Sequence, residues 1–208
     1  MRRLAAVAIF CALSASVGTA NAQVIEFESG GLKYQTLTRG GVTIMFAHLP
    51  TEIRGYSLIQ VAVSNGSPRK TLIRPEDFLF ELAGGRTIQG VQATQVINQL
   101  LRGSSANDVI KLVTTYEMGL YGMGRIQSTN GYEQRRQSAL AVVSSKNLKA
   151  AAAASAIAFV ETELAPGQST DGAVFYPTAS TYTQAFRLRV TTPDEVFEFQ
   201  PSSPASPK

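Results

Sequence analysis

The chain has 208 residues, a formal net charge of +4 and 44% hydrophobic residues. That length suits one domain of about 100–200 residues with enough apolar side chains for a true core. Cys11 is the only cysteine and His48 the only histidine, which excludes a disulfide-rich fold and argues against a zinc site built from several His and Cys ligands.

Residues 1 to about 22 are typical of a cleavable secretory signal. Arg2 and Arg3 form a positive n-region, and the mostly apolar run behind them is too short for a spanning helix of roughly 20 apolar residues. Ala20-Asn21-Ala22 then supplies a small-x-small cleavage pattern. We therefore expect an exported protein, periplasmic or extracellular, whose mature chain begins at Gln23. The alternative is a segment retained as a membrane anchor.

Loss of this segment removes the sole cysteine and both of its arginines, so the predicted mature chain has no thiol and a net charge nearer +2. Exported eukaryotic domains of this size usually carry disulfides, so a cysteine-free domain fits a bacterial envelope better. We expect no transmembrane segment in the mature chain, because no other stretch is long and apolar enough to span a bilayer.

Period-two alternation of apolar residues then predicts half-buried strands at both ends of the mature chain. The alternating stretches are 42–46, 59–63, 78–82, 186–190 and 197–199. Turn signals such as Gly40-Gly41 and Thr192-Pro193 separate them. We predict a mainly β fold, an antiparallel β-sandwich of about seven to eight strands.

Between about residues 91 and 161 the apolar residues follow the period of a helix. Ser105 and Asp108 form a capping box before a second helix, and Asn130 with Glu133 is placed to cap a third that runs into an alanine-rich segment. One helical face is expected from a set of residues before Gly103: Ala93, Val96, Ile97, Leu100 and Leu101.

We expect these two to three helices to form an insertion on one edge or end of the sandwich, within a single domain over residues 23–200. The alternative is two domains in series. Residues 201–208 are rich in proline and serine and are predicted to be a disordered tail.

Three stretches carry a family resemblance: 56–65 (YSLIQVAVSN), 74–82 (RPEDFLFEL) and 164–176 (LAPGQSTDGAVFY). They resemble bacterial exported immunoglobulin-like sandwiches, the telokin-like immunoprotective extracellular proteins and their relatives, over about a sixth of the chain. The helical insertion departs from that pattern. The resemblance implies an Ig-like β-sandwich that serves as a binding or adhesion-type module, with no catalytic residues to carry over.

Few motifs suggest chemistry. His48 follows an alternating strand and precedes Leu49-Pro50, so it reads as a strand-end or turn histidine. Ser67-Pro68-Arg69-Lys70 matches the Ser-x-x-Lys of penicillin-recognising enzymes only formally, because it lies in a turn and lacks the companion motifs. Arg74-Pro75-Glu76-Asp77 is the closest approach to a calcium site, but Arg74 is expected to pair with a carboxylate and the motif is expected to be a strand entry.

Other motifs are equally weak. Asn65-Gly66-Ser67 matches a glycosylation acceptor but is expected to be a turn. The glycines at 119, 122 and 124 lack the strand–loop–helix frame of a phosphate loop. Glu161 and Glu163 are a minimal carboxylate pair for glycoside chemistry, although such pairs are usually solvated. We predict no catalytic residue, no metal site and no cofactor.

Charge is unevenly distributed. Residues 91–160 hold seven basic and three acidic side chains, so the rest of the predicted mature chain is negative. A basic helical face suits an anionic envelope surface or a protein partner, whereas the predicted export and the modest charge argue against nucleic acid. The predicted contact residues combine apolar and basic groups, namely Tyr121, Met123, Arg125, Arg135 and Arg136.

The function expected from the sequence is therefore a non-catalytic, exported interaction or binding module of the bacterial envelope. Two alternatives stay open. One is a carboxylate-dependent hydrolase of envelope polymer, acting in a cleft between helices and sandwich. The other is a structural component of an envelope assembly whose edge strands pair with neighbours.

Overall fold

The fold is described from a computed structural model, which places residues 23–82, 85–122, 128–129, 131, 134, 138, 146–177 and 186–200. The predicted signal at 1–22 and the predicted tail at 201–208 lie outside these residues. The described part is mainly antiparallel β-structure with a helical insertion, as predicted.

The largest sheet has five antiparallel strands in the order β1-β2-β3-β4-β9. Tight turns at Gly30-Gly31, Gly40-Gly41 and Arg54-Gly55 join its first four strands, and every residue in these turns has a positive φ. The fifth strand returns from late in the chain, so that Val61 pairs with Gly172. The strands are β1 (Ile25–Ser29), β2 (Leu32–Arg39), β3 (Val42–Ile53), β4 (Tyr56–Asn65) and β9 (Ser169–Pro177).

A four-stranded sheet in the order β11-β10-β6-β7 faces the five-stranded sheet. A separate pair, β5 with β8, connects the segment after β4 to the segment before β9. Pro75–Asp77 forms a single 3-10 turn, η1, before β6. The remaining strands are β5 (Thr71–Ile73), β6 (Phe78–Leu82), β7 (Thr87–Gln89), β8 (Thr162–Leu164), β10 (Phe186–Thr191) and β11 (Val196–Phe199).

The described residues thus form eleven strands, against the seven to eight predicted from the sequence. The difference comes from the β1–β2 hairpin and from strands of three residues. Three-residue strands are too short to show a period. In β1 the apolar positions Ile25 and Phe27 remain exposed, so this strand has no buried face.

Aromatic and branched side chains from both sheets fill the space between them. Phe46 of β3 contacts Phe199 of β11 edge to face, with ring centroids 5.0 Å apart. The Tyr176 hydroxyl of β9 donates to the Phe78 carbonyl of β6 over 3.4 Å. The sequence pattern that predicted alternating strands therefore corresponds to a real core between two sheets.

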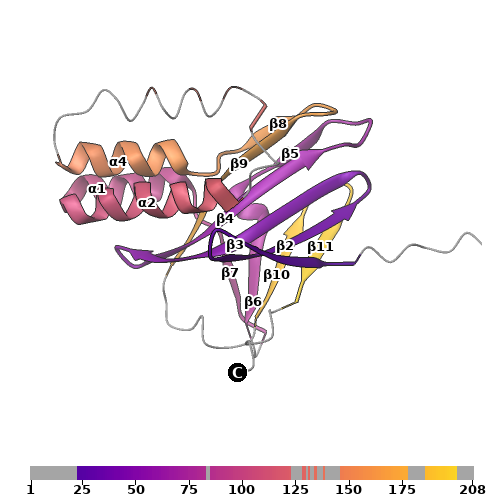
Figure 1. The fold of residues 1–208 in the computed structure, drawn as a ribbon, viewed down its shortest axis with the longest axis horizontal. Helices are drawn as coiled ribbons and strands as arrows, with labels where there is room; N and C mark the ends of the chain where they lie inside the picture. The colour runs from indigo at the N-terminus through magenta and orange to yellow at the C-terminus, as the bar shows by residue number, and fades with distance from the viewer. Residues whose placement is uncertain are drawn as a thin grey trace, which may run out of the picture.

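The three described helices cover the opposite face of the five-stranded sheet (Figure 1). They are α1 (Ala93–Gly103), α2 (Ala106–Gly122) and α4 (Lys146–Ile157), which pack on one another and on the sheet. Val96 and Leu100 of α1 are buried, as its apolar face predicted, while Leu101 is 41% exposed.

The expected position of the helices, on an edge or end of the sandwich, is therefore wrong. The five-stranded sheet is a middle layer, with helices on one face and the second sheet on the other. Two adjacent strands of this sheet, β4 and β9, are buried along almost their whole length, on both faces. The alanines of α4 allow that helix to lie close to α1 and α2, because they add little bulk to the contact.

The predicted capping box at the start of α2 is confirmed. The Ser105 backbone N–H donates to Asp108 Oδ2 over 2.6 Å, and the Asp108 N–H donates to Ser105 Oγ over 3.2 Å. The predicted start of the third helix, at Asn130 and Glu133, lies outside the described residues. None of the described helices is both long enough and apolar enough to cross a membrane.

Candidate functional site

The long strand β3 is interrupted by a bulge. His48 pairs with Ile59, but the next pair is Glu52 with Ser57, so three residues of β3 lie opposite one residue of β4. Pro50 is at the centre of this bulge, where its missing N–H does not cost a ladder hydrogen bond. Beyond the bulge the two strands pair again and close the hairpin at Arg54-Gly55.

The bulge borders an open cavity of about 470 Å³. This volume lies within the range of about 300–1,000 Å³ found for small-ligand sites. Its lining combines apolar and polar side chains from β3 and β4: His48, Leu49, Pro50, Thr51, Glu52, Ser57 and Leu58. Bulges of this kind recur beside binding and active sites because they re-aim side chains out of the regular ladder.

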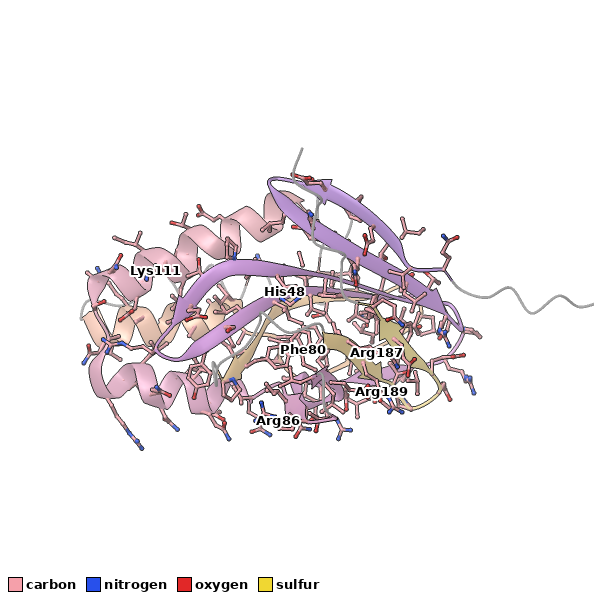
Figure 2. All side chains as sticks on the ribbon, turned by 90° about the horizontal axis from the view of Figure 1, so that it is seen from below. His48, Phe80, Arg86, Lys111, Arg187 and Arg189 are labelled. Carbon is pink, nitrogen blue, oxygen red and sulfur yellow. The ribbon has the colours of Figure 1, made fainter. Side chains whose placement is uncertain are left out.

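His48 forms the aromatic part of this site. Its ring stacks on Phe80 of β6, with centroids 5.6 Å apart and planes at 18°, and meets Phe46 edge to face at 5.7 Å. Figure 2 shows His48 and Phe80 next to each other, with Arg187 and Arg189 on β10, the strand that pairs with β6. The imidazole therefore connects the two sheets at the cavity.

Burial among these groups lowers the pKa of His48 to about 4, because apolar neighbours disfavour the charged imidazolium. The side chain nevertheless keeps contact with solvent, since His48 is among the exposed residues. Crowding around the ring, and not complete enclosure, causes the lowered pKa. At neutral pH the imidazole is uncharged and offers one hydrogen-bond donor and one acceptor.

The expectation that His48 ends a strand or occupies a turn is wrong. β3 continues through Leu49 and Pro50 to Ile53. The misleading signal was Pro50, which normally ends a strand but is tolerated at a bulge. The same proline, two residues after the histidine that follows the alternating stretch 42–46, was the signal in the sequence that could have revealed the cavity.

The predicted turn at Asn65-Gly66-Ser67 is confirmed. Asn65 is fully buried, and its side-chain amide donates to the carbonyls of Arg69 (2.7 Å) and Leu164 (2.9 Å). Its Oδ1 accepts hydrogen bonds from both the N–H and the hydroxyl of Ser67. Lys70 pairs with Glu163 over 2.5 Å. The serine and the lysine of the Ser-x-x-Lys match are therefore both engaged in contacts within the fold.

The other acidic motifs are also structural. Arg74, which was predicted to pair with a carboxylate, pairs with Asp77 over 3.2 Å at η1. Glu163 lies in β8 and is exposed, as is Glu161 just before that strand. Within the described residues, no group of three or more His, Cys, Asp or Glu side chains is arranged to hold a metal ion.

The predicted contact residues of the helical insertion remain untested. Tyr121 lies in the last turn of α2, but its side chain is outside the described set. Met123, Arg125, Arg135 and Arg136 lie outside the described residues altogether. The described residues that line the cavity all come from β3 and β4.

No family model matches this chain. Searches against curated proteins and against solved structures gave no significant match either. The resemblance to telokin-like exported proteins therefore stays a prediction from the three sequence stretches.

Proposed function

We propose that this protein is an exported, non-catalytic binding module of the bacterial envelope, and that it holds a ligand in the cavity beside the β3 bulge. The observation that carries this proposal is the bulge itself. It interrupts an otherwise regular strand and leaves a histidine, a serine and a carboxylate beside a cavity of ligand size.

The chemistry of the lining supports binding of a small, partly apolar molecule. Leu49, Pro50 and Leu58 offer apolar surface, and the neutral His48 ring is held by Phe80. Polar contacts come from hydroxyl groups and from the Glu52 carboxylate, which favours a ligand with hydroxyl or amine donors. Because the aromatic stack fixes the ring, the site is largely formed before a ligand arrives.

A hydrolase that uses two carboxylates is less well supported. Such chemistry needs a pair of carboxyl groups facing one bond, whereas Glu52 is the one carboxylate in the described lining. The cavity also lies at the bulge of β3 and not in a cleft between helices and sandwich, where that alternative would place it. A catalytic role for Glu52 predicts that Glu52→Gln abolishes turnover without loss of binding, whereas the binding proposal predicts that this variant weakens capture of the ligand.

The basic helical insertion remains a second predicted contact surface, for an anionic envelope component. Replacing Arg125, Arg135 and Arg136 with Glu tests this surface separately from the cavity. Loss of capture in this variant alone would place the contact on the helices, and unchanged capture would remove them from the proposal.

The cavity is tested with Glu52→Trp. The chain has no tryptophan, so this substitution both fills the cavity and introduces a single fluorophore there. Glu117→Trp is the matched control, because Glu117 is an exposed glutamate of α2 outside the lining. Immobilised wild type and Glu117→Trp should capture the same component from envelope extract, and Glu52→Trp should not.

Equal capture by Glu52→Trp would exclude the cavity as the binding site. No capture above a bare-resin control by any variant would contradict the binding function itself. Intact-mass measurement of the secreted protein tests export independently, with Gln23 expected as the first residue.

A further inference from the structure

Within the described part of the chain, the first strand of the five-stranded sheet has an open outer edge. β1 is the last strand in the sheet order, and among the described strands β2 alone pairs with it. Natural proteins usually protect such an edge with charged side chains, especially lysine, or with proline, a bulge or a covering element. The sequence of β1, IEFES, has no proline or lysine, its charged residues are two glutamates, and its register with β2 is regular.

Backbone geometry shows which residues point outward. Ser29 and Leu32 flank the two-residue turn at Gly30-Gly31, and such flanking residues form a hydrogen-bonded pair. Hydrogen-bonded pairs alternate along an antiparallel ladder. The N–H and C=O groups of Glu28, and likewise those of Glu26, therefore point away from β2 toward the open edge.

The two faces of β1 differ in character. Ile25 and Phe27 are 61% and 39% exposed, and Phe27 stacks on Tyr34 at 5.2 Å. This face belongs to the helical side of the sheet, where Tyr34 packs in the core, and α2 also contacts β1. The opposite face carries Glu26 and Glu28. The edge therefore presents an apolar row on one side and an acidic row on the other.

A second copy of this chain does not suit the edge. In an antiparallel pair of β1 strands, outward-pointing residues must lie opposite outward-pointing residues. In every such register, Glu26 or Glu28 of one copy lies directly opposite Glu26 or Glu28 of the other copy. Like charges directly opposite each other destabilise a strand pair.

We propose that the β1 edge binds an extended segment of another protein, in which apolar and basic residues alternate. The segment adds a strand to the sheet by backbone hydrogen bonds. Its basic side chains lie against Glu26 and Glu28, and its apolar side chains continue the row of Ile25 and Phe27. This inference does not depend on the cavity and concerns a different part of the sheet.

The chain itself contains an example of this pairing. β10 has the sequence FRLRVT, and its arginines reach glutamates on both neighbouring strands. Arg187 lies 3.5 Å from Glu198 of β11, and Arg189 lies 3.6 Å from Glu81 of β6. A strand with alternating arginines is thus accepted between two glutamate-bearing strands in this fold.

The test is fluorescence anisotropy with a labelled peptide of the β10 sequence, FRLRVT, and the purified protein at low ionic strength. We expect saturable binding that weakens as salt rises. The double variant Glu26→Lys/Glu28→Lys should bind this peptide roughly tenfold more weakly, because two favourable cross-strand charge pairs become repulsive. A peptide with glutamate in place of both arginines should show the opposite preference.

Two controls separate edge pairing from simple charge attraction. A peptide N-methylated at alternate residues keeps its charges but loses backbone donors, and it should not bind. Glu52→Trp should bind FRLRVT as the wild type does. A failure of the proposed ligand binding in the cavity can therefore be told apart from a failure of the proposed peptide binding at the β1 edge. Circular dichroism checks that each variant folds, and Glu28→Gln serves as a milder variant, with an intermediate loss expected.

Equal affinity of the wild type and the charge-reversed protein for both peptides would overturn the proposal. So would binding that survives N-methylation. Sedimentation that shows a wild-type dimer lost in Glu26→Lys/Glu28→Lys would replace the proposed partner by a second copy of the chain.

Discussion

Arg54 Nε lies 3.1 Å from Asp108 Oδ2, and this ion pair joins the tip of the β3–β4 hairpin to the first turn of α2. The Gln99 side-chain amide of α1 donates to the Arg54 carbonyl over 2.9 Å, so both helices hold the same turn. Arg54 is also the one non-glycine residue with a positive φ in the described part of the chain. The hairpin beyond the cavity is therefore fixed by the helical layer.

Asp108→Ala should lower the free energy of unfolding by about 1–2 kcal/mol, because it removes the capping box together with the ion pair. Arg54→Gly should cost less, since the ion pair is partly exposed and glycine relieves the positive φ. Urea unfolding of both single variants and the double variant measures the coupling. A coupling well above ~1 kcal/mol would contradict an exposed pair.

Asp108 should also make the stability of the fold depend on pH. Burial alone would raise the pKa of Asp108, but hydrogen bonds from Ser105 and the ion pair with Arg54 outweigh it and lower that pKa. The stabilisation is therefore present above the unfolded pKa of 3.8 and is lost as pH falls below that value. In Asp108→Asn this acid-dependent part should disappear, as urea midpoints between neutral and acidic pH will show.

His48 should destabilise the fold at mildly acidic pH. Its pKa is lowered from 6.5 to about 4 in the folded protein, so the unfolded chain binds the proton first as pH falls. The free energy of unfolding should therefore fall as the pH drops from 6.5 to about 4. Above pH 6.5 the full stability should be present. Because solvent reaches the ring, we expect a smaller effect than for a fully enclosed imidazole.

The measurement is the difference in urea midpoint between wild type and His48→Gln across that pH range. Subtracting the variant removes the contribution of carboxylates, which titrate in the same range. A difference that stays constant with pH would show that His48 titrates normally.

Gly172→Ala should destabilise the fold strongly. A Cβ at Gly172 would lie 2.7 Å from the backbone N and Cα of Phe159, and Ala158 next to it is bridged to Ala173. Backbone atoms cannot move aside as a flexible side chain can, so we expect the free energy of unfolding to fall by roughly 1–3 kcal/mol. Gly103→Ala is the matched control, because its Cβ would meet open space at the end of α1. Thermal unfolding that ranks the two variants equally would contradict this close approach.

Gln60→Met should stabilise the protein. Gln60 is fully buried in the row between Ala47 and Ala173, and neither its Nε2 nor its Oε1 has a hydrogen-bond partner in the described part of the chain. Methionine has a similar shape without the cost of the unpaired amide, so we expect a gain of about 1 kcal/mol. A loss of stability would show that the amide is satisfied in solution.

The sequence predicted much of the sandwich because its signals are local. Alternation identified the strands around Phe46, Val61, Phe80 and Leu188, and Ser105 with Asp108 located the start of α2. These patterns depend on burial of one face and on a cap that spans a few residues, both of which are visible in a short window.

The position of the helices was not predictable in the same way. Alanines of α4 belong to one buried cluster with Ala173 of β9, a cluster assembled from distant segments of the chain. Alanine gives a strong helix propensity and almost no preference for a face. The cavity was missed for a related reason, since a bulge at Pro50 depends on the pairing of β3 with β4 and not on β3 alone.

The middle layer has a consequence for the order of folding. β4 lies between β3, its neighbour in sequence, and β9, which comes only after the helical insertion. Pairs such as Val61 with Gly172 require most of the chain to be present, and contacts of such long sequence separation slow folding. A nascent chain that lacks β9 therefore has neither the last strand of its five-stranded sheet nor the bridge that attaches the end of α4, and the protein completes its central layer late in synthesis or after it.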